Sequence, residues 1–201
     1  DNNVYNDIDL ACRKLILGNN KVCGLTAPEY AIAAAESGAR FGGLIFAEKS
    51  PRCITKEQAL IIVATRPHLE YVGVFVNHKR CEIVDLVKSL NLTAVQLHGN
   101  EDDAYIEDLK LKLNENKCEL CQVWQANPVL DNVPELNVKV AHHVLDGKSP
   151  GSGQVFDWQT LAISEQDLST SLLAGGLNSD NINLALTQLT HLDLFGLDLN
   201  S

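Results

Sequence analysis

The chain has 201 residues, of which 45% are hydrophobic and 21% charged, and its formal net charge at pH 7 is -10. This composition predicts one globular domain with a sizeable core. An acidic body repels nucleic acid and anionic membrane surfaces, and no apolar stretch reaches the roughly 18 residues of a membrane span or resembles a signal peptide. We therefore expect a cytoplasmic protein with no nucleic-acid partner and no membrane partner.

The first 19 residues differ in pattern from the rest. They carry apolar residues at helical spacing, namely Ile8, Leu10, Ala11, Leu15 and Ile16. Gly18 ends this pattern, as glycine commonly does at the end of a helix. The chain starts at Asp1 and contains no methionine, which indicates an excerpt of a longer protein. We predict that residues 1–19 are a terminal helix or linker from a preceding domain and that residues 20–201 form the main domain.

From residue 21 onward, apolar runs of strand length alternate with helical patterns, which is typical of βα units and a parallel sheet. Eight strands are predicted, at residues 21–23, 43–46, 71–76, 94–97, 120–126, 140–145, 171–173 and 191–197. Helices are predicted between them at residues 28–37, 55–66, 79–90, 102–113 and 181–189. The crossovers at residues 129–136 and 158–163 have weaker helical patterns and are expected to be short or irregular.

The strand runs are nearly continuous in apolar residues, as expected for strands buried on both faces. Eight such runs favour an α/β fold closed into a (β/α)8 TIM barrel. The competitor is a doubly wound open sheet, which usually carries G-x-G-x-x-G after its first strand, whereas this chain has C-G-L-T at residues 23–26. The sequence ends directly after the eighth predicted strand, so we predict a barrel that is incomplete at the C-terminus because its final helix is missing.

The chain contains six cysteines: Cys12, Cys23, Cys53, Cys81, Cys118 and Cys121. The size of the chain and the lack of a signal peptide favour free thiols over disulfides. Cys118 and Cys121 form a C-x-x-C motif, but a structural zinc site needs four ligands and no second pair lies nearby. We expect no metal site and interpret this pair as two small buried residues on a strand.

In a TIM barrel, the loops at the C-terminal ends of the strands build the active site. Cys23 ends the first strand, where a thiol can act as base or nucleophile once a positive group or helix N-terminus favours the thiolate. Asp146 ends the sixth strand, where a carboxyl group after an apolar run is well placed as a general acid. Read alone, Cys23 is equally well a packed core residue, and Asp146 has the alternative of a helix cap or turn.

Glycine-rich segments follow the later strands. Gly153 lies in a loop after the sixth strand and lets backbone N–H groups approach an anion. Gly175 and Gly176 follow the seventh strand, and Asn200 and Ser201 follow the eighth. Loops after strands seven and eight are the usual phosphate site of these barrels, so we predict a phosphorylated small-molecule substrate.

Two further polar residues stand at strand ends. Arg52, on the loop after the second strand, offers a planar guanidinium that suits a carboxylate. His98 ends the fourth strand, and its simpler interpretation is a histidine that is hydrogen-bonded structurally.

Taken together, these segments resemble phosphoribosylanthranilate isomerase from residue 20 to residue 201. The motifs occur in order as K-V-C-G-L-T (21–26), G-L-I-F (43–46), S-P-R (50–52), V-G-V-F (72–75), V-Q-L-H-G (95–99), V-L-D (144–146), G-S-G (151–153), F-D-W (156–158) and L-A-G-G-L (173–177).

The resemblance implies an Amadori rearrangement in tryptophan biosynthesis that needs no metal or organic cofactor. N-(5-phosphoribosyl)anthranilate would become 1-(2-carboxyphenylamino)-1-deoxyribulose 5-phosphate, with Cys23 as base, Asp146 as acid and Arg52 bound to the anthranilate carboxylate. It also implies a phosphate site made of Gly153, Gly175, Gly176, Asn200 and Ser201. The leading segment resembles the junction in bifunctional forms, so fusion to an indole-3-glycerol-phosphate synthase domain is expected.

Two alternatives remain open. Fold does not fix function, so another sugar-phosphate barrel enzyme, such as a Schiff-base aldolase, fits the same scaffold. Its candidate lysine is Lys21, which precedes Cys23 by two residues but is expected below the rim. The second alternative is an inactive barrel that supports its neighbouring domain; the joint presence of Cys23, Arg52 and Asp146 argues against it.

Overall fold

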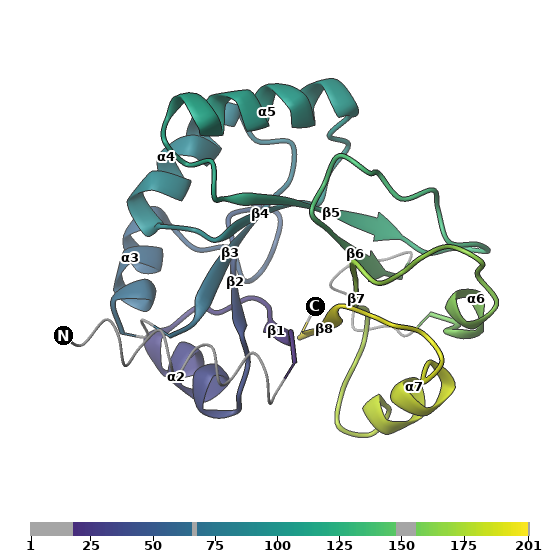
Figure 1. Ribbon diagram of the computed structural model, residues 1–201. Coiled ribbons are helices and arrows are strands. Elements are labelled where there is room, and N and C mark those ends of the chain that lie inside the picture. Colours follow the sequence, from purple (N-terminus) through teal and green to yellow (C-terminus); the bar gives the residue numbers. More distant parts are fainter. Residues whose placement is uncertain (1–17, 66–67, 148–155, 201) are drawn as a thin grey trace.

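The computed structural model of the chain describes residues 18–65, 68–147 and 156–200. Eight parallel strands follow one another around a closed barrel in chain order, and β8 pairs with β1 (Figure 1). The strands are β1 (Lys21–Val22), β2 (Phe41–Ile45), β3 (Glu70–Phe75), β4 (Ala94–Leu97), β5 (Gln122–Pro128), β6 (His142–Asp146), β7 (Ser171–Leu173) and β8 (Gly196–Leu199). The prediction of a TIM barrel is confirmed.

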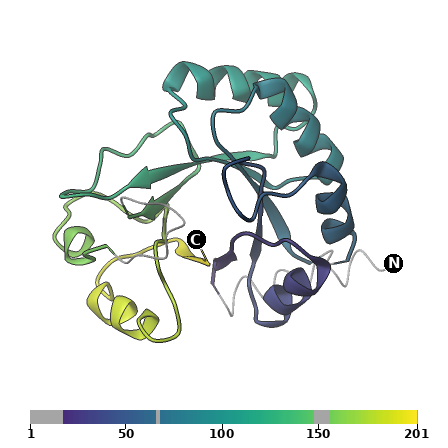
Figure 2. The same cartoon turned by 180° about the vertical axis from the view of Figure 1, so that it is seen from behind.

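Helices lie outside the barrel, but unevenly, and those after β1 to β4 form a continuous arc (Figure 2). The helices in the described part of the chain are α2 (Pro28–Glu36), α3 (Lys56–Thr65), α4 (Arg80–Leu90), α5 (Asp103–Glu115), α6 (Gln159–Ala162) and α7 (Ile182–Gln188). The connection from β5 to β6 contains none, and the crossover at residues 158–163 forms only the short α6. None of these helices is both long and apolar enough to cross a membrane.

Local signals explain several helix boundaries. Pro28 begins α2, where the first N–H of a helix has no partner to lose. The Asp102 carboxylate accepts a hydrogen bond from the Tyr105 backbone N–H at 2.8 Å and so caps α5. Asn91 ends α4 in the left-handed conformation that asparagine tolerates.

The barrel interior is filled in layers by side chains that alternate along the strands. One buried cluster comprises Phe41, Val72, Ala94, Trp124, Val144, Leu172 and Ala174. A second, smaller cluster comprises Cys23, Ile45 and Val74, which also line the cavity at the barrel mouth. Because successive residues of a strand face opposite sides, this parity decides which polar side chains reach the barrel mouth.

The eighth strand differs from its prediction. Residues 191–197 were expected to be extended, but β8 is Gly196–Leu199, and the preceding residues form a turn and loop. Leu192 and Leu194 pack against the cluster around α7 instead of pairing in the sheet. The first residue of the strand is glycine because its backbone passes so close to the Asn19 carbonyl that a Cβ at Gly196 would overlap it. Asp198 therefore lies inside the strand, opposite Lys21, and not in the loop after it.

Candidate active site

The C-terminal mouth of the barrel holds a cavity of about 320 Å³. Its lining comes from five strands, from residues just after β1, β3 and β4, and from the loop after β2: Cys23, Ile45, Ala47, Lys49, Ser50, Pro51, Arg52, Val74, Val76, Gln96, His98, Val144, Asp146 and Asp198. The three residues predicted to carry acid, base and carboxylate recognition, namely Cys23, Asp146 and Arg52, thus line one cavity although the chain separates them widely.

Cys23 follows directly after β1 and is only 5% exposed. Its backbone N–H donates to the Leu199 carbonyl at 2.9 Å, which continues the β1–β8 pairing to the rim. Burial raises the pKa of the Cys23 thiol above its usual value, while the nearby positive charges of Lys21 and Arg52 lower it. The thiol is therefore buried in an environment that contains compensating cations.

Asp146 is the last residue of β6 and is 2% exposed. Its Oδ1 accepts a hydrogen bond from the Gly147 backbone N–H at 2.7 Å. Burial raises the pKa of this carboxyl group; the Gly147 N–H opposes the rise and the charge of Asp198 adds to it. A carboxyl group with a raised pKa holds its proton to higher pH, which a general acid requires.

Arg52 bridges the loop after β2 to the end of β8. Its Nη1 donates to the carbonyl oxygen of Cys23 at 3.2 Å and to that of Asn200. The side chain lies against Gly24, which has a φ of +77°, and a Cβ there would be 2.5 Å from Nη1. Glycine at position 24 is what lets the guanidinium reach the mouth.

Of the two glycines predicted in the phosphate site after β7, Gly175 lies next to the acid. Gly175 has a φ of +80°, and a Cβ at this position would lie 2.7 Å from Asp146 Oδ1. Gly176 also has a positive φ, and its carbonyl accepts from the side chains of Asn178 and Asn181. Both conformations are ones that glycine adopts at little cost.

Of the three other residues predicted for the phosphate site, the structure describes only Asn200. Asn200 has a φ of 61°, and its Nδ2 donates to the Cys23 carbonyl at 3.0 Å. Gly153 and Ser201 lie outside the described residues, as do residues 1–17 of the predicted leading helix. The structure therefore brings together Cys23, Arg52, Asp146, Gly175 and Asn200.

A buried ion pair lies beneath these residues, and the sequence analysis did not identify it. Lys21 Nζ lies 2.7 Å from Asp198 Oδ2, and the two side chains are 0% and 1% exposed. The expectation that Lys21 sits below the rim is confirmed by this burial. Asp198 went unrecognised because its strand was predicted two residues too early.

Two polar side chains on β4 and just after it also reach the cavity. Gln96 Oε1 and His98 Nε2 are buried without a hydrogen-bond partner among the described residues. Burial and the charge of Lys21 lower the pKa of His98 to about 4, so its ring is neutral at neutral pH. His98 was expected to be hydrogen-bonded structurally, but its Nε2 has no such partner among the described residues. The spacing of two residues between Gln96 and His98 was the signal that both face the interior.

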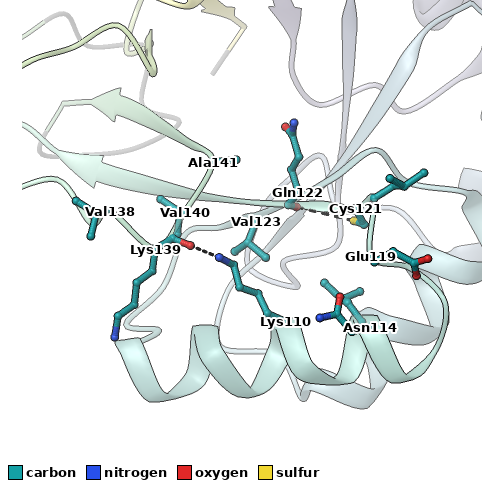
Figure 3. A pocket seen from close by; sticks show the side chains of 12 residues that line it. Lys110, Asn114, Glu119, Cys121, Gln122, Val123, Val138, Lys139, Val140 and Ala141 are labelled. Carbon is teal, nitrogen blue, oxygen red and sulfur yellow. Dashed lines mark hydrogen bonds between the residues drawn. The ribbon is translucent and has the colours of Figure 1, made fainter.

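A second hollow of about 340 Å³ lies on the outside of the barrel, between α5 and the segments before β5 and β6 (Figure 3). Lys110 of α5 donates to the Lys139 carbonyl across it. Cys121 borders this hollow, and burial together with the neighbouring Cys118 raises its pKa to about 12. The C-x-x-C cysteines are half-buried in the turn before β5, and no group of His, Cys, Asp and Glu able to hold a metal occurs among the described residues.

The sequence matches the family model of N-(5'-phosphoribosyl)anthranilate (PRA) isomerase over residues 20–201. The chain belongs to the PRA isomerase family. Solved PRA isomerase structures have the same fold: the enzyme of Thermus thermophilus superposes with a TM-score of 0.72 at 30% identity, covering 90% of this chain and 86% of that one. A PRA isomerase in complex with reduced 1-(o-carboxyphenylamino)-1-deoxyribulose 5-phosphate superposes with a TM-score of 0.66 at 29% identity, with the same coverage.

Curated relatives in the PRA isomerase family are longer proteins. The tryptophan biosynthesis protein TrpCF of Vibrio cholerae is 44% identical over 200 residues, and the TrpCF protein of Yersinia pestis is 44% identical over 197 residues. Each alignment covers 97% of this chain, but only 40% and 39%, respectively, of the relative. The chain therefore spans about two fifths of the length of the curated relatives it matches.

Proposed function

We propose that this domain catalyses the Amadori rearrangement of N-(5-phosphoribosyl)anthranilate to 1-(2-carboxyphenylamino)-1-deoxyribulose 5-phosphate in tryptophan biosynthesis. Family membership over residues 20–201 supports the reaction class. The observation that carries the proposal for this chain is that Cys23, Arg52 and Asp146 line one cavity at the barrel mouth. Acid, base and an anchor for a carboxylate are the groups this rearrangement needs.

The first step is opening of the ribose ring. Asp146 donates its proton to the ring oxygen as the bond from that oxygen to C1 breaks, and the anthranilate nitrogen supplies the electron pair that forms the protonated Schiff base. The raised pKa of Asp146, caused chiefly by burial, keeps the proton available at higher pH than for an exposed aspartate. The next residue, Gly147, donates to Oδ1 and fixes the orientation of the carboxyl group.

The second step is removal of the proton on C2. The Cys23 thiolate takes this proton, and the electrons of the C–H bond move to neutralise the iminium, which gives an enolamine. Tautomerisation with a proton added at C1 then gives the ketone. Because only protons move and the phosphate is retained, the proposed route needs neither an oxidant nor a phosphate acceptor.

Substrate binding is proposed to use two groups of residues at the mouth. The Arg52 guanidinium would hold the anthranilate carboxylate in a charge-assisted pair. Backbone amides around Gly175 and Gly176, with Gly153, Asn200 and Ser201, would hold the phosphate. The buried Gln96 Oε1 and His98 Nε2 have hydrogen-bonding capacity left over at the cavity, which a polar substrate would use.

We also propose that this domain is fused to an indole-3-glycerol-phosphate synthase domain that precedes residue 20, as in the bifunctional forms that the sequence resembles. The lengths of the TrpCF relatives support a second domain. A cytoplasmic location is proposed as well, because Cys23 is a free cysteine and a reducing compartment keeps a thiol base reduced.

A Schiff-base aldolase is a weaker alternative for this site. Such an enzyme needs a lysine that becomes a free amine, but Lys21 is bound to Asp198 at 2.7 Å. Burial acts to lower the Lys21 pKa, but the charges of Asp198 and Cys23 outweigh it and raise the pKa above its usual value. Lys21 therefore stays an ammonium ion, which cannot attack a carbonyl.

The test is the loss of fluorescence of N-(5-phosphoribosyl)anthranilate with the full-length protein beside its Cys23→Ala and Asp146→Asn variants. Turnover should fall by about 1,000-fold or more in each variant if the two act as base and acid, since a positioned acid or base contributes about 10² to 10⁴. Binding of a reduced product analogue should persist in both. Absence of turnover in the folded natural protein would favour a structural role of the barrel beside its neighbour.

A further inference from the structure

The Lys21–Asp198 ion pair has no part in the steps above, yet it joins β1 to β8 and its Asp198 lines the cavity. Both side chains are almost fully buried, and Nζ lies 2.7 Å from Oδ2. Burial of two charges is unfavourable unless their geometry is good, and apolar residues of similar volume are often at least as stable. Packing alone therefore gives no reason for charges at this position.

The geometry connects this pair to the thiol. Lys21 on β1 and Cys23 directly after it are two residues apart, so both side chains face the barrel interior. Gly43 on β2 lies close to both, because a Cβ there would be 3.0 Å from Cys23 Sγ and 3.2 Å from Lys21 Cε. The end of the lysine side chain and the sulfur thus share the space that Gly43 leaves open.

We propose that Lys21, held in place by Asp198, is a positioning residue that stabilises the thiolate of Cys23 and so sets how readily the base forms. This inference rests on the proposed role of Cys23 in proton transfer. Asp198 acts one step further away, because it anchors the ammonium group and keeps it charged.

The charges around the thiol support this arrangement. Burial raises the pKa of Cys23, and the ammonium of Lys21 is the largest influence that lowers it; Asp198 raises it further, and Arg52 lowers it. Asp146, His98 and Lys49 line the same cavity. Without Lys21, burial of the thiol would be opposed only by the half-buried Arg52, and the neutral thiol would persist to higher pH.

The test is the pH dependence of Cys23 alkylation by iodoacetamide in the full-length protein, followed by mass spectrometry of the peptides. In a Lys21→Met variant, which keeps the length of the side chain, the midpoint of the Cys23 profile should rise by about one pH unit or more, as expected on removal of a nearby opposite charge. The exposed Cys81 in the same sample is the control, and its profile should not move. An unchanged Cys23 midpoint in folded Lys21→Met would overturn the proposal.

Lys21→Met leaves Asp198 buried without its cation, which destabilises the fold. The double variant Lys21→Met/Asp198→Asn removes both charges together and restores a neutral interior. If Lys21 and Asp198 have a purely structural role, the folded double variant should keep the natural midpoint of Cys23 alkylation, and this result would refute the proposal. A raised midpoint supports it. Alkylation requires no turnover, so this result is distinguishable from a failure of the proposed reaction. If the natural protein turns over, the acid limb of its kcat/KM profile should move to higher pH in the same variants.

Discussion

Cys23 at the barrel mouth and Cys121 beside α5 are two thiols that burial affects in the same direction but that have different neighbours. Burial raises the pKa of each. At Cys121 the only other influence is the second cysteine, Cys118, which raises the pKa further, to about 12. At Cys23, Lys21 and Arg52 oppose the rise. A buried thiol therefore becomes a candidate base through its cationic neighbours and not through burial.

The two hollows that contain these thiols are also similar in size, about 320 Å³ at the mouth and about 340 Å³ beside α5. Volume therefore does not identify the site. The mouth cavity combines a desolvated carboxyl group, a thiol and two cations at the C-terminal ends of strands, whereas the outer hollow lies beside the turn before β5 (Figure 3). The following predictions test whether this difference in chemistry separates them.

Among variants outside the acid and base themselves, the largest effect is expected from Gly175→Ala. The new Cβ would lie 2.7 Å from Asp146 Oδ1 in a conformation with φ +80°, so the acid must move. Displacing a catalytic group by about 1 Å costs roughly 100-fold in kcat, to be measured by the fluorescence assay. Gly38→Ala is the matched control, because Gly38 also has a positive φ, of 85°, but ends α2 away from the cavity. Equal losses of activity in both variants would contradict the assigned role of Gly175.

Arg52→Gln should lower kcat/KM by roughly 10- to 100-fold, because a hydrogen bond to a charged group contributes about 1.5–3 kcal/mol. Most of this loss should be a higher KM, since the proposed carboxylate contact exists before and during the reaction. Steady-state rates over a range of substrate concentrations separate the change in KM from the change in kcat. Arg80→Gln removes a guanidinium that pairs with Asp108 on the barrel exterior and should leave KM unchanged.

His98 makes stability depend on pH. Its pKa is about 4 in the folded protein and 6.5 ordinarily, so between these values the unfolded state binds more protons and stability falls as the pH drops. The contribution of the buried, neutral His98 ring to the free energy of unfolding is fully present above pH 6.5, and roughly 2 kcal/mol of it is lost by pH 5. His98→Gln should flatten this dependence in urea denaturation at pH 5 and pH 8. The same slope in the variant and the natural protein would contradict the burial of a neutral histidine at the mouth.

The smallest effect is expected from Cys121→Ala. Because the outer hollow is not the proposed site, kcat/KM should stay within about twofold of the natural value, as for substitutions away from catalytic groups. Cys121 itself should resist iodoacetamide at pH 8, where a thiol with a pKa of about 12 is almost entirely protonated. A large loss of activity in this variant would break the distinction between the two hollows.

Much of the barrel was predictable because its signals are local. Seven strands were predicted at or close to their observed positions, since apolar runs and helical patterns are properties of short segments. Cys23, Arg52 and Asp146 were recognisable because each stands at or just beyond a strand end. The eighth strand was placed too early because its apolar residues extend back to residue 192, and nothing local says which of them enter the sheet.

The sequence by itself determined the order of strands and helices, the closed barrel and the rim on which the candidate acid and base stand. Only the tertiary structure decided the pairing of Lys21 with Asp198, the approach of Gly175 to Asp146, and the burial of Gln96 Oε1 and His98 Nε2 without a hydrogen-bond partner in the part of the chain that the structure describes. The physical reason is the distance along the chain: Lys21 and Asp198 are 177 residues apart, and they meet only when the barrel closes between β1 and β8. The local pattern does not fix strand register to better than a residue or two. The register adopted in the barrel then decides which side chains face the interior.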